Sequence, residues 1–296
     1  MAIPEAQLET WAAIGAQVTS KDTYADIKAV LEHADAPFRS RQPCVFLQGS
    51  YGNDTNVRTE SDVDIVIRMD SVFYYDISAL SADDHKAFTR DHPPSEYRLQ
   101  EFKAEVVQWL VANYSSDVDV GNKAVTIAAR GNRRKADVLI SAKHKRFYYA
   151  GFMGTDSVEG VKFLTRNGQW IVNYPQLHST NLTTRHQATN NWLKPAARIL
   201  KNMRSRATEA GILSTGVAPS YYIEGLLYNV PVHLFGKSYA DTVWNCLNWL
   251  LQVDKSEFRC ANEQHTLLAA DSSVSWHPDH CRAFLDGLAA FWNTWP

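Results

Sequence analysis

Two short apolar runs set the pattern of the first part of the chain. Val45-Phe46-Leu47 ends at Gly49-Ser50, and Ile65-Val66-Ile67 follows after a polar stretch. Runs of β-branched and aromatic residues of this length, bounded by turn residues, are typical of strands in a sheet. The pattern therefore predicts two strands, at about 44–48 and 62–68, that are connected through a tight turn at Gly49-Ser50.

A second pair of apolar runs predicts a hairpin. Val125-Thr126-Ile127 and Val138-Leu139-Ile140 flank a basic segment, 130–135, that contains Gly131-Asn132. This arrangement favours two antiparallel strands across a turn. Apolar residues at helical spacing predict a helix over 96–114, whereas 71–94 shows no regular period and is expected to be irregular. Helices are also expected over 4–17 and 23–34, and strands over 147–152, 160–164 and 170–172.

From Thr184 onward the apolar positions follow helical periods alone. They predict helices over 185–207, 219–229, 238–253 and 282–294. Strands and helices first, and then helices only, indicate an α+β protein with a mixed sheet flanked by helices and a separate helical part. We place the first lobe in residues 1–180 and the helical lobe in residues 181–296.

Composition is that of an ordinary globular protein. The 296 residues are 45% hydrophobic and 21% charged, and the net charge of −2 argues against a constitutive nucleic-acid binder. The start, Met1-Ala2-Ile3-Pro4-Glu5, lacks the basic and apolar regions expected of a secretory signal, and no apolar run approaches the length of a membrane span. The four cysteines are widely spaced and form no CxxC pair, which is typical of reduced thiols in the cytoplasm.

Acidic residues next to the predicted strands suggest a metal site. Asp62 and Asp64 are two residues apart, so on a strand they point to one face, about 7 Å apart. Carboxylates held this close repel unless a cation neutralises them, and hard oxygen ligands suit Mg²⁺ or Mn²⁺. Asp137, at the start of an apolar strand, is the natural third carboxylate, and Asp119 on a shorter strand is the competing candidate.

Other residues have the chemistry to bind a triphosphate. Gly49 lets the backbone approach a ligand, and Ser50 offers an N–H group and a hydroxyl. Arg198 and Lys201 share a helical face with further basic residues, although such a face is equally compatible with simple solvation. Ser220 near a helix start could bind phosphate or cap the helix, and the adjacent Tyr221 could stack on a base or only pack.

In this order, the motifs resemble those of bacterial cGAS/DncV-like nucleotidyltransferases (CD-NTases) of CBASS anti-phage systems, within the DNA polymerase β superfamily. The resemblance covers about residues 40–230. It rests on Gln48-Gly49-Ser50-Tyr51, Thr55, Asp62-Val63-Asp64, Asp137, Asn173-Tyr174-Pro175 with His178, Lys201 and Pro219-Ser220-Tyr221.

The resemblance implies a polymerase β-like catalytic lobe and an α-helical C-terminal lobe with the active site in a cleft between them. Asp62, Asp64 and Asp137 would be the catalytic residues and would hold two Mg²⁺ ions, for which Mn²⁺ can substitute. The expected product is a cyclic dinucleotide, or alternatively a trinucleotide, that acts as a second messenger in anti-phage defence. The implied substrate-binding residues are Gln48, Gly49, Ser50, Asn173, Arg198, Lys201, Ser220 and Tyr221.

The expected partners are nucleoside triphosphates, ATP first, with a second nucleotide left open. Asn173 would be equivalent to an asparagine that some uridine-using relatives carry, but an amide at this point can equally cap a turn. The family's animal DNA sensor has a zinc thumb and a basic surface, and because neither is evident here we expect no activation by DNA. We expect a monomer that does not bind membranes, with a regulatory protein partner left open.

Two other classes of function use the same acids. A different nucleotidyltransferase would make linear oligoadenylate or transfer a nucleotide to RNA, a protein or a small molecule, and an RNA-tailing enzyme would favour a more basic surface. A catalytically idle nucleotide sensor is the non-enzymatic alternative, and three intact acids argue against it.

Overall fold

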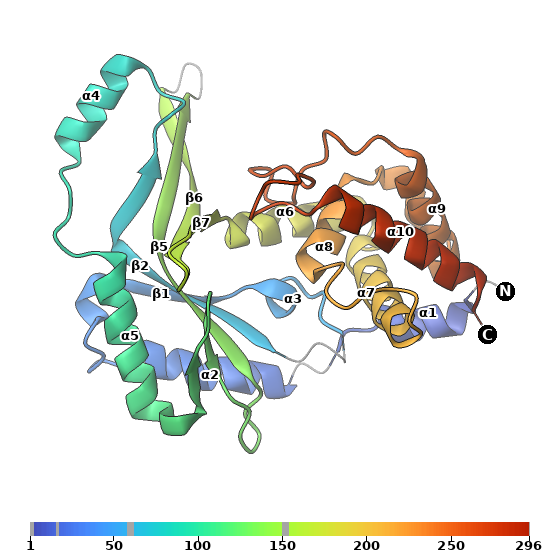
Figure 1. The fold of residues 1–296 in the computed structure, drawn as a ribbon, viewed down its shortest axis with the longest axis horizontal. Coiled ribbons are helices and arrows are strands. Elements are labelled where there is room, and N and C mark those ends of the chain that lie inside the picture. Colours follow the sequence, from blue (N-terminus) through green and yellow to red (C-terminus); the bar gives the residue numbers. More distant parts are fainter. Residues whose placement is uncertain (1–2, 16–17, 58–61, 150–153, 296) are drawn as a thin grey trace. The chain divides into compact units, whose positions relative to one another are not determined.

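The computed structural model describes residues 3–15, 18–57, 62–149 and 154–295 (Figure 1). The chain forms two compact units. The sheet unit consists of Thr19–Leu47 and Asp62–Pro175, and the helical unit consists of Met1–Val18, Gln48–Ser61 and Gln176–Pro296. The sequence-based division placed a single boundary at residue 180. The two units are instead interleaved, because the N-terminal helix and the segment after the first strand belong with the C-terminal helices.

A mixed seven-stranded sheet forms the centre of the sheet unit. Its strands are β1 (Pro43–Leu47), β2 (Val63–Asp76), β3 (Val118–Val120), β4 (Val125–Ile127), β5 (Ala136–Tyr149), β6 (Thr155–Leu164) and β7 (Trp170–Asn173). The order is β1-β2-β5-β4-β3, and β6 pairs with both β5 and β7. β2 and β5 run parallel, while every other pairing is antiparallel.

The predicted hairpin is confirmed. Val125 pairs with Val138 and Ile127 with Ala136, in antiparallel register. β5 is longer than predicted, because beyond Ala142 it pairs with β6 along the same edge that β4 occupies near its start. Of the strand predicted over 147–152, residues 147–149 belong to β5, and 150–152 lie outside the described residues.

The prediction of an irregular segment over 71–94 is wrong. β2 continues to Asp76 after a register shift between Met69 and Phe73, and α4 (Ala82–Asp91) follows. Phe88 on α4 packs edge-on against Tyr75 and against Phe147 on β5. These aromatic contacts explain why the segment is ordered although its sequence lacks a clear period.

Two helices of the sheet unit contact each other. They are α2 (Val18–Leu31) and α5 (Leu99–Tyr114), and both were predicted within a few residues. The indole N–H of Trp109 donates to the carbonyl of Val30 at 2.8 Å, and the Tyr114 hydroxyl donates to Asp26 at 3.1 Å. The short helices η1 (Arg39–Arg41) and η2 (Ser115–Asp117) lead into β1 and β3.

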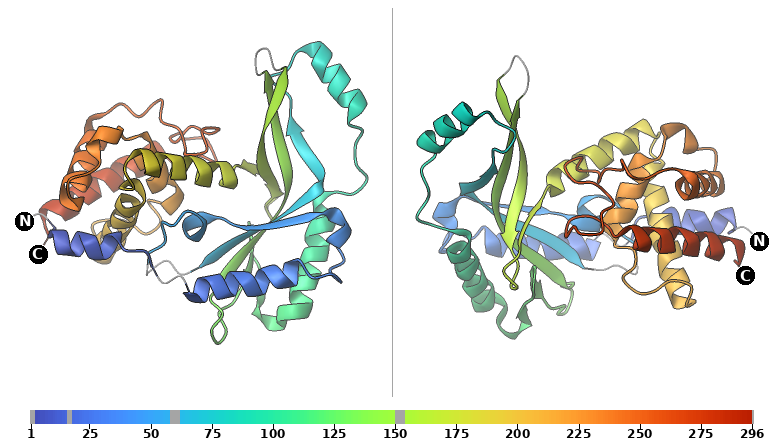
Figure 2. Two further views of the ribbon diagram at one scale, coloured as in Figure 1. Left: turned by 180° about the vertical axis from the view of Figure 1, so that it is seen from behind. Right: turned by 45° about the horizontal axis from the view of Figure 1, so that its top comes forward.

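The helical unit is built around α7 (Leu193–Glu209), which packs against α1 (Glu5–Ala12), α8 (Ser220–Asn229), α9 (Tyr239–Gln252) and α10 (Pro278–Asn293) (Figure 2). Further helices among the described residues are α3 (Gly49–Gly52), α6 (Pro175–Ala188) and η4 (Val232–Leu234). Ala196, Ile199 and Leu200 of α7 are buried in one apolar core with residues of the surrounding helices. Among the described residues, no helix is both long enough and apolar enough to cross a membrane.

The helix predicted over 185–207 is two helices. α6 ends at Ala188, and α7 begins at Leu193. Between them Asn190 and Asn191 adopt φ values of 49° and 68°, a left-handed conformation that asparagine tolerates better than most residues. The first helix is also shorter than its predicted range of 4–17, since α1 ends at Ala12 and residues 16–17 lie outside the described part of the chain.

Candidate active site

Two of the predicted acids lie side by side in the sheet unit. Asp64 on β2 and Asp137 on β5 are register partners on adjacent parallel strands, which places their Cα atoms about 4.8 Å apart. Their neighbours Val63, Ile65 and Val138 are buried, whereas both aspartates are only partly buried. Because side chains alternate along a strand, the two carboxylates lie on the same face of the sheet, opposite these apolar side chains.

Asp62 precedes β2 by one residue and is held by a lysine. Lys135 Nζ lies 2.5 Å from Asp62 Oδ2 and 3.9 Å from Asp137 Oδ2. The hydrogen bond to Asp62, together with the charges of Asp137 and Asp64, raises the pKa of Lys135. The ammonium group therefore neutralises part of the negative charge that these acids concentrate at the start of β2 and β5.

Thr126 positions the Asp137 carboxylate. It sits opposite Asp137 on β4, and its hydroxyl donates to Asp137 Oδ1 at 2.6 Å. Asp119, the competing candidate, lies on β3 and pairs with Thr126 of β4, so two strands, β5 and β4, separate it from Asp64 on β2. The structure therefore places Asp137, and not Asp119, next to Asp64.

The donor set suits a hard divalent cation. Asp62, Asp64 and Asp137 offer carboxylate oxygens, the ligands that Mg²⁺ and Mn²⁺ prefer. In the described part of the chain, no group of three or more His, Cys, Asp or Glu side chains is arranged around a common point for a metal. Lys135 occupies Oδ2 of Asp62, so a cation that binds this oxygen would displace the ammonium.

The segment after β1 forms one helical turn where the sequence predicted a plain turn. β1 ends at Leu47, whose partner Ile65 directly follows Asp64, and the chain then enters the helical unit. Gln48 is extended, Gly49 adopts φ = +65°, and α3 starts there. This left-handed conformation explains the glycine, because a side chain at this φ would be strained.

Lys201, predicted to contact a triphosphate, is fully buried in the helical unit. Its Nζ lies 2.8 Å from Glu224 Oε1 and also donates to the carbonyl and the hydroxyl of Thr55, at 3.1 and 3.0 Å. These contacts use all three N–H donors of the ammonium, so binding a phosphate would require it to give up one of them. The contacts therefore favour a structural role for Lys201.

Arg198 also makes internal contacts. Its Nε donates to the carbonyl of Ala12 and its Nη1 to the carbonyl of Asp54, both at 2.5 Å, and only 6% of the residue is exposed. Burial lowers the pKa of Arg198 from its ordinary value. These bonds hold α1 and the loop after α3 against α7.

The remaining predicted substrate-binding residues occupy helix and strand ends. Asn173 ends β7, and its side-chain oxygen accepts the N–H of Tyr174 at 2.8 Å. In this structure the amide therefore caps the turn. Ser220 begins α8 and accepts a bond from Arg204 at 3.2 Å. Tyr221 stacks on His178 with ring centroids 4.6 Å apart, and its hydroxyl accepts from Asn262.

Sequence reasoning overlooked Glu224. The residue is 2% exposed and lies in α8 between the buried Ile223 and Gly225. The sequence did hold a signal, which is an acid inside an otherwise apolar helical stretch. A carboxylate in such a position needs cationic or hydrogen-bonding partners, so it indicates a buried polar network. Lys135 was likewise counted only as part of a basic turn.

Comparisons with known proteins identify the family of the chain. The family model for the cGAS/DncV-like nucleotidyltransferase C-terminal helical domain matches residues 180–293. The cyclic UMP-AMP synthase of Rhodothermus marinus is 36% identical over 100% of this chain and 99% of that protein. The cyclic nucleotide synthase CdnE01 of Staphylococcus haemolyticus is 34% identical, with 100% of both chains covered.

Solved structures extend the similarity to the whole fold. The Rhodothermus marinus CdnE c-UMP-AMP synthase with Apcpp and Upnpp superposes with a TM-score of 0.89, covering 99% of this chain and 97% of that one. The Elizabethkingia meningoseptica CdnE cyclic dinucleotide synthase with GTP and Apcpp gives a TM-score of 0.79 at 28% identity, with 98% of both chains covered.

Proposed function

The chain belongs to the cGAS/DncV-like nucleotidyltransferases, and on that premise we propose that it joins two nucleoside triphosphates into a cyclic dinucleotide. The observation that supports this most strongly is the pairing of Asp64 with Asp137 on adjacent parallel strands, beside Asp62, in a chain that matches cyclic nucleotide synthases over its full length. The product would act as a second messenger in anti-phage defence.

The reaction is two successive nucleotidyl transfers. In the first, a ribose hydroxyl oxygen of one nucleotide bonds to the α-phosphorus of the other, the bond from that phosphorus to the β-phosphate oxygen breaks, and pyrophosphate leaves. The second transfer closes the ring in the same way and releases a second pyrophosphate. Each attacking hydroxyl loses one proton, which passes to solvent, and we propose that Asp137 lies beside that hydroxyl.

We propose that Asp62, Asp64 and Asp137 hold two Mg²⁺ ions, which Mn²⁺ can replace. Bound there, the ions would make the hydroxyl a better nucleophile and would neutralise charge on the α-phosphate. Thr126 keeps the Asp137 carboxylate oriented through its bond to Oδ1. Lys135 holds Asp62 until the substrate and its cation enter.

We propose ATP and UTP as the first substrates to test, by analogy with the Rhodothermus marinus enzyme and the Apcpp and Upnpp in its structure. Gln48, Gly49 and Ser50 would contact phosphate oxygens, and Tyr221 would contact a base. Asn173 would present its amide to uracil, whose edge both donates and accepts hydrogen bonds. Asn173 Oδ1 accepts the Tyr174 N–H here, and its second lone pair and its NH2 group would be the groups that face the base.

The test is product analysis by mass spectrometry. The purified protein is incubated with all four triphosphates and Mg²⁺ or Mn²⁺, treated with phosphatase and compared with the Asp64→Asn variant. A phosphatase-resistant cyclic dinucleotide that is absent from the variant reaction supports the proposal, and omission of single nucleotides identifies the bases. Only linear or transferred nucleotides would instead favour a different nucleotidyltransferase activity.

A further inference from the structure

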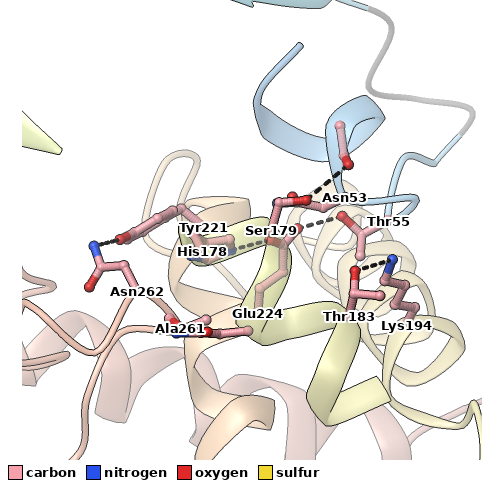
Figure 3. A network of polar contacts seen from close by, with 12 residues as sticks. Asn53, Thr55, His178, Ser179, Thr183, Lys194, Tyr221, Glu224, Ala261 and Asn262 are labelled. Carbon is pink, nitrogen blue, oxygen red and sulfur yellow. Dashed lines mark hydrogen bonds and ion pairs between the residues drawn. The ribbon is translucent and has the colours of Figure 1, made fainter. Parts of the chain in front are cut away.

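The Glu224 carboxylate is the centre of a buried polar network in the helical unit (Figure 3). Its Oε1 accepts from Thr55 Oγ1 at 2.5 Å and from Lys201 Nζ at 2.8 Å. Its Oε2 accepts from Asn53 Nδ2 and from His178 Nε2, both at 2.9 Å. Two of these donors come from the loop after α3, and the other two from α6 and α7.

The network is arranged to keep Glu224 ionised in the interior. Burial alone would raise the pKa of this carboxyl, but the charge of Lys201 and the bond from His178 reverse the effect and hold the pKa well below its usual range. Lys201 and Glu224 are 0% and 2% exposed. A buried ion pair with further donors on each oxygen is costly to break, so the four partners are fixed together.

The two loop donors connect this network to the Gly49-Ser50 segment. The backbone N–H of Thr55 donates to the carbonyl of Ser50 at 2.9 Å, and that of Asn53 donates to the carbonyl of Gly49 at 3.1 Å. Lys201 adds a bond to the carbonyl of Thr55. Each residue of the segment is therefore one backbone hydrogen bond away from a residue that Glu224 holds.

Two further contacts act on the same loop from α6 and α7. Ser179 donates to the carbonyl of Gly52 at 3.3 Å, and Arg198 donates to the carbonyl of Asp54. A helix of four residues such as α3 has almost no internal hydrogen bonds to keep it formed. Its conformation thus depends on these contacts with the rest of the helical unit.

We infer that Glu224 is a positioning residue for the triphosphate: through Thr55 and Asn53 it holds the Gly49-Ser50 segment in the conformation that receives the phosphate groups. This inference rests on the proposed function, because it assigns that segment to phosphate binding. Glu224 itself touches no substrate, and Lys201 serves as its counter-ion rather than as a phosphate ligand.

The direct test is Thr55→Val, which removes the hydroxyl that donates to Glu224 and accepts from Lys201, while the Glu224–Lys201 ion pair stays in place. Thr242→Val is the matched control, since Thr242 is equally buried, with 0% exposure, and its hydroxyl bonds to the backbone of Gly236 on the way into α9. Thr55→Ser keeps the hydroxyl and should restore wild-type behaviour. All four proteins are titrated with Apcpp and Mg²⁺ by calorimetry, and their thermal unfolding is recorded in parallel.

The expected result is a Kd for Apcpp that rises about tenfold in Thr55→Val, the size of one hydrogen bond to a charged group. Thr242→Val should lower the melting temperature about as much as Thr55→Val does. It should leave the Kd for Apcpp unchanged. Equal Kd values in Thr55→Val and the wild type would overturn the inference. If the wild type itself does not bind Apcpp, the result contradicts the proposed function. Equal binding by the wild type and Thr55→Val contradicts only the inference about Glu224.

Discussion

Replacing Lys135 with methionine should strengthen the binding of a divalent cation. Lys135 Nζ lies 2.5 Å from Asp62 Oδ2 and 3.9 Å from Asp137 Oδ2, so the ammonium competes for the oxygens that a metal would use. Methionine keeps most of the length of the side chain and removes its charge. The cation then has no ammonium to displace, and the negative charge of the acids is no longer partly neutralised by Lys135.

The size of the effect follows from distance and exposure. At an effective dielectric constant of about 20, unit charges 3.9 Å apart attract by about 4 kcal/mol. Lys135 and Asp62 are 44% and 41% exposed, however, and exposed ion pairs contribute only about 0.2–1 kcal/mol. Taking about 1 kcal/mol, we expect Mn²⁺ to bind Lys135→Met about fivefold more tightly than it binds the wild type.

The assay is a Mn²⁺ titration without nucleotide, followed by electron paramagnetic resonance of the free ion. Lys28→Met is the matched control, because Lys28 forms an exposed ion pair with Glu32 along α2 and its loss should leave the Mn²⁺ affinity unchanged. Equal or weaker binding by Lys135→Met would refute the reasoning that Lys135 competes with the metal.

Three further predictions concern single side chains. Asp137→Asn should reduce product formation at least a hundredfold, whereas Asp119→Asn, two strands beyond Asp137 in the sheet, should stay within about twofold, as measured by initial rates of pyrophosphate release. Glu224→Gln should lower the free energy of unfolding, measured in urea, by about 3–5 kcal/mol, because it leaves the buried Lys201 charge without its counter-ion. The double variant with Lys201→Met should recover most of that loss, and no recovery would contradict the ion-pair account. Burial lowers the pKa of His144 to about 4, so below pH 6.5 the unfolded chain binds a proton at this residue that the folded protein does not. The free energy of unfolding should therefore fall as the pH is lowered from 6.5 to 4. His144→Leu should make this dependence on pH weaker, as measured by urea unfolding at pH 7.5, 6 and 5.

The parts of the fold that the sequence predicted correctly are those with a local period. β1, β4 and the start of β5 are short apolar runs between turn residues, and their pairing follows from that pattern. The end of β2 was missed because Phe73 and Tyr75 are ordered by aromatic contacts with distant residues such as Phe88 on α4. The break before α7 was missed because Asn190 and Asn191, which tolerate the left-handed conformation, lie between two segments of continuous helical period.

In the candidate site, too, local patterns predicted some residues correctly, whereas long-range contacts placed others. The pairing of Asp64 with Asp137 depends on strand register, which period-two spacing and the apolar neighbours specify well. The role of Lys201 could not be predicted, because its partners Thr55 and Glu224 are 146 and 23 residues away along the chain. A basic helical face looks the same in sequence whether its members are solvated, bind phosphate or neutralise a buried acid.

The most direct test of the proposed synthesis is the ratio of pyrophosphate released to phosphatase-resistant product formed. The wild type is supplied with ATP, UTP and Mg²⁺, and both quantities are measured in the same reaction. Two nucleotidyl transfers predict two pyrophosphates for each cyclic molecule, and neither species should appear with Asp64→Asn. One pyrophosphate per molecule, in a product that phosphatase degrades, would show that the chain is extended but the ring is not closed.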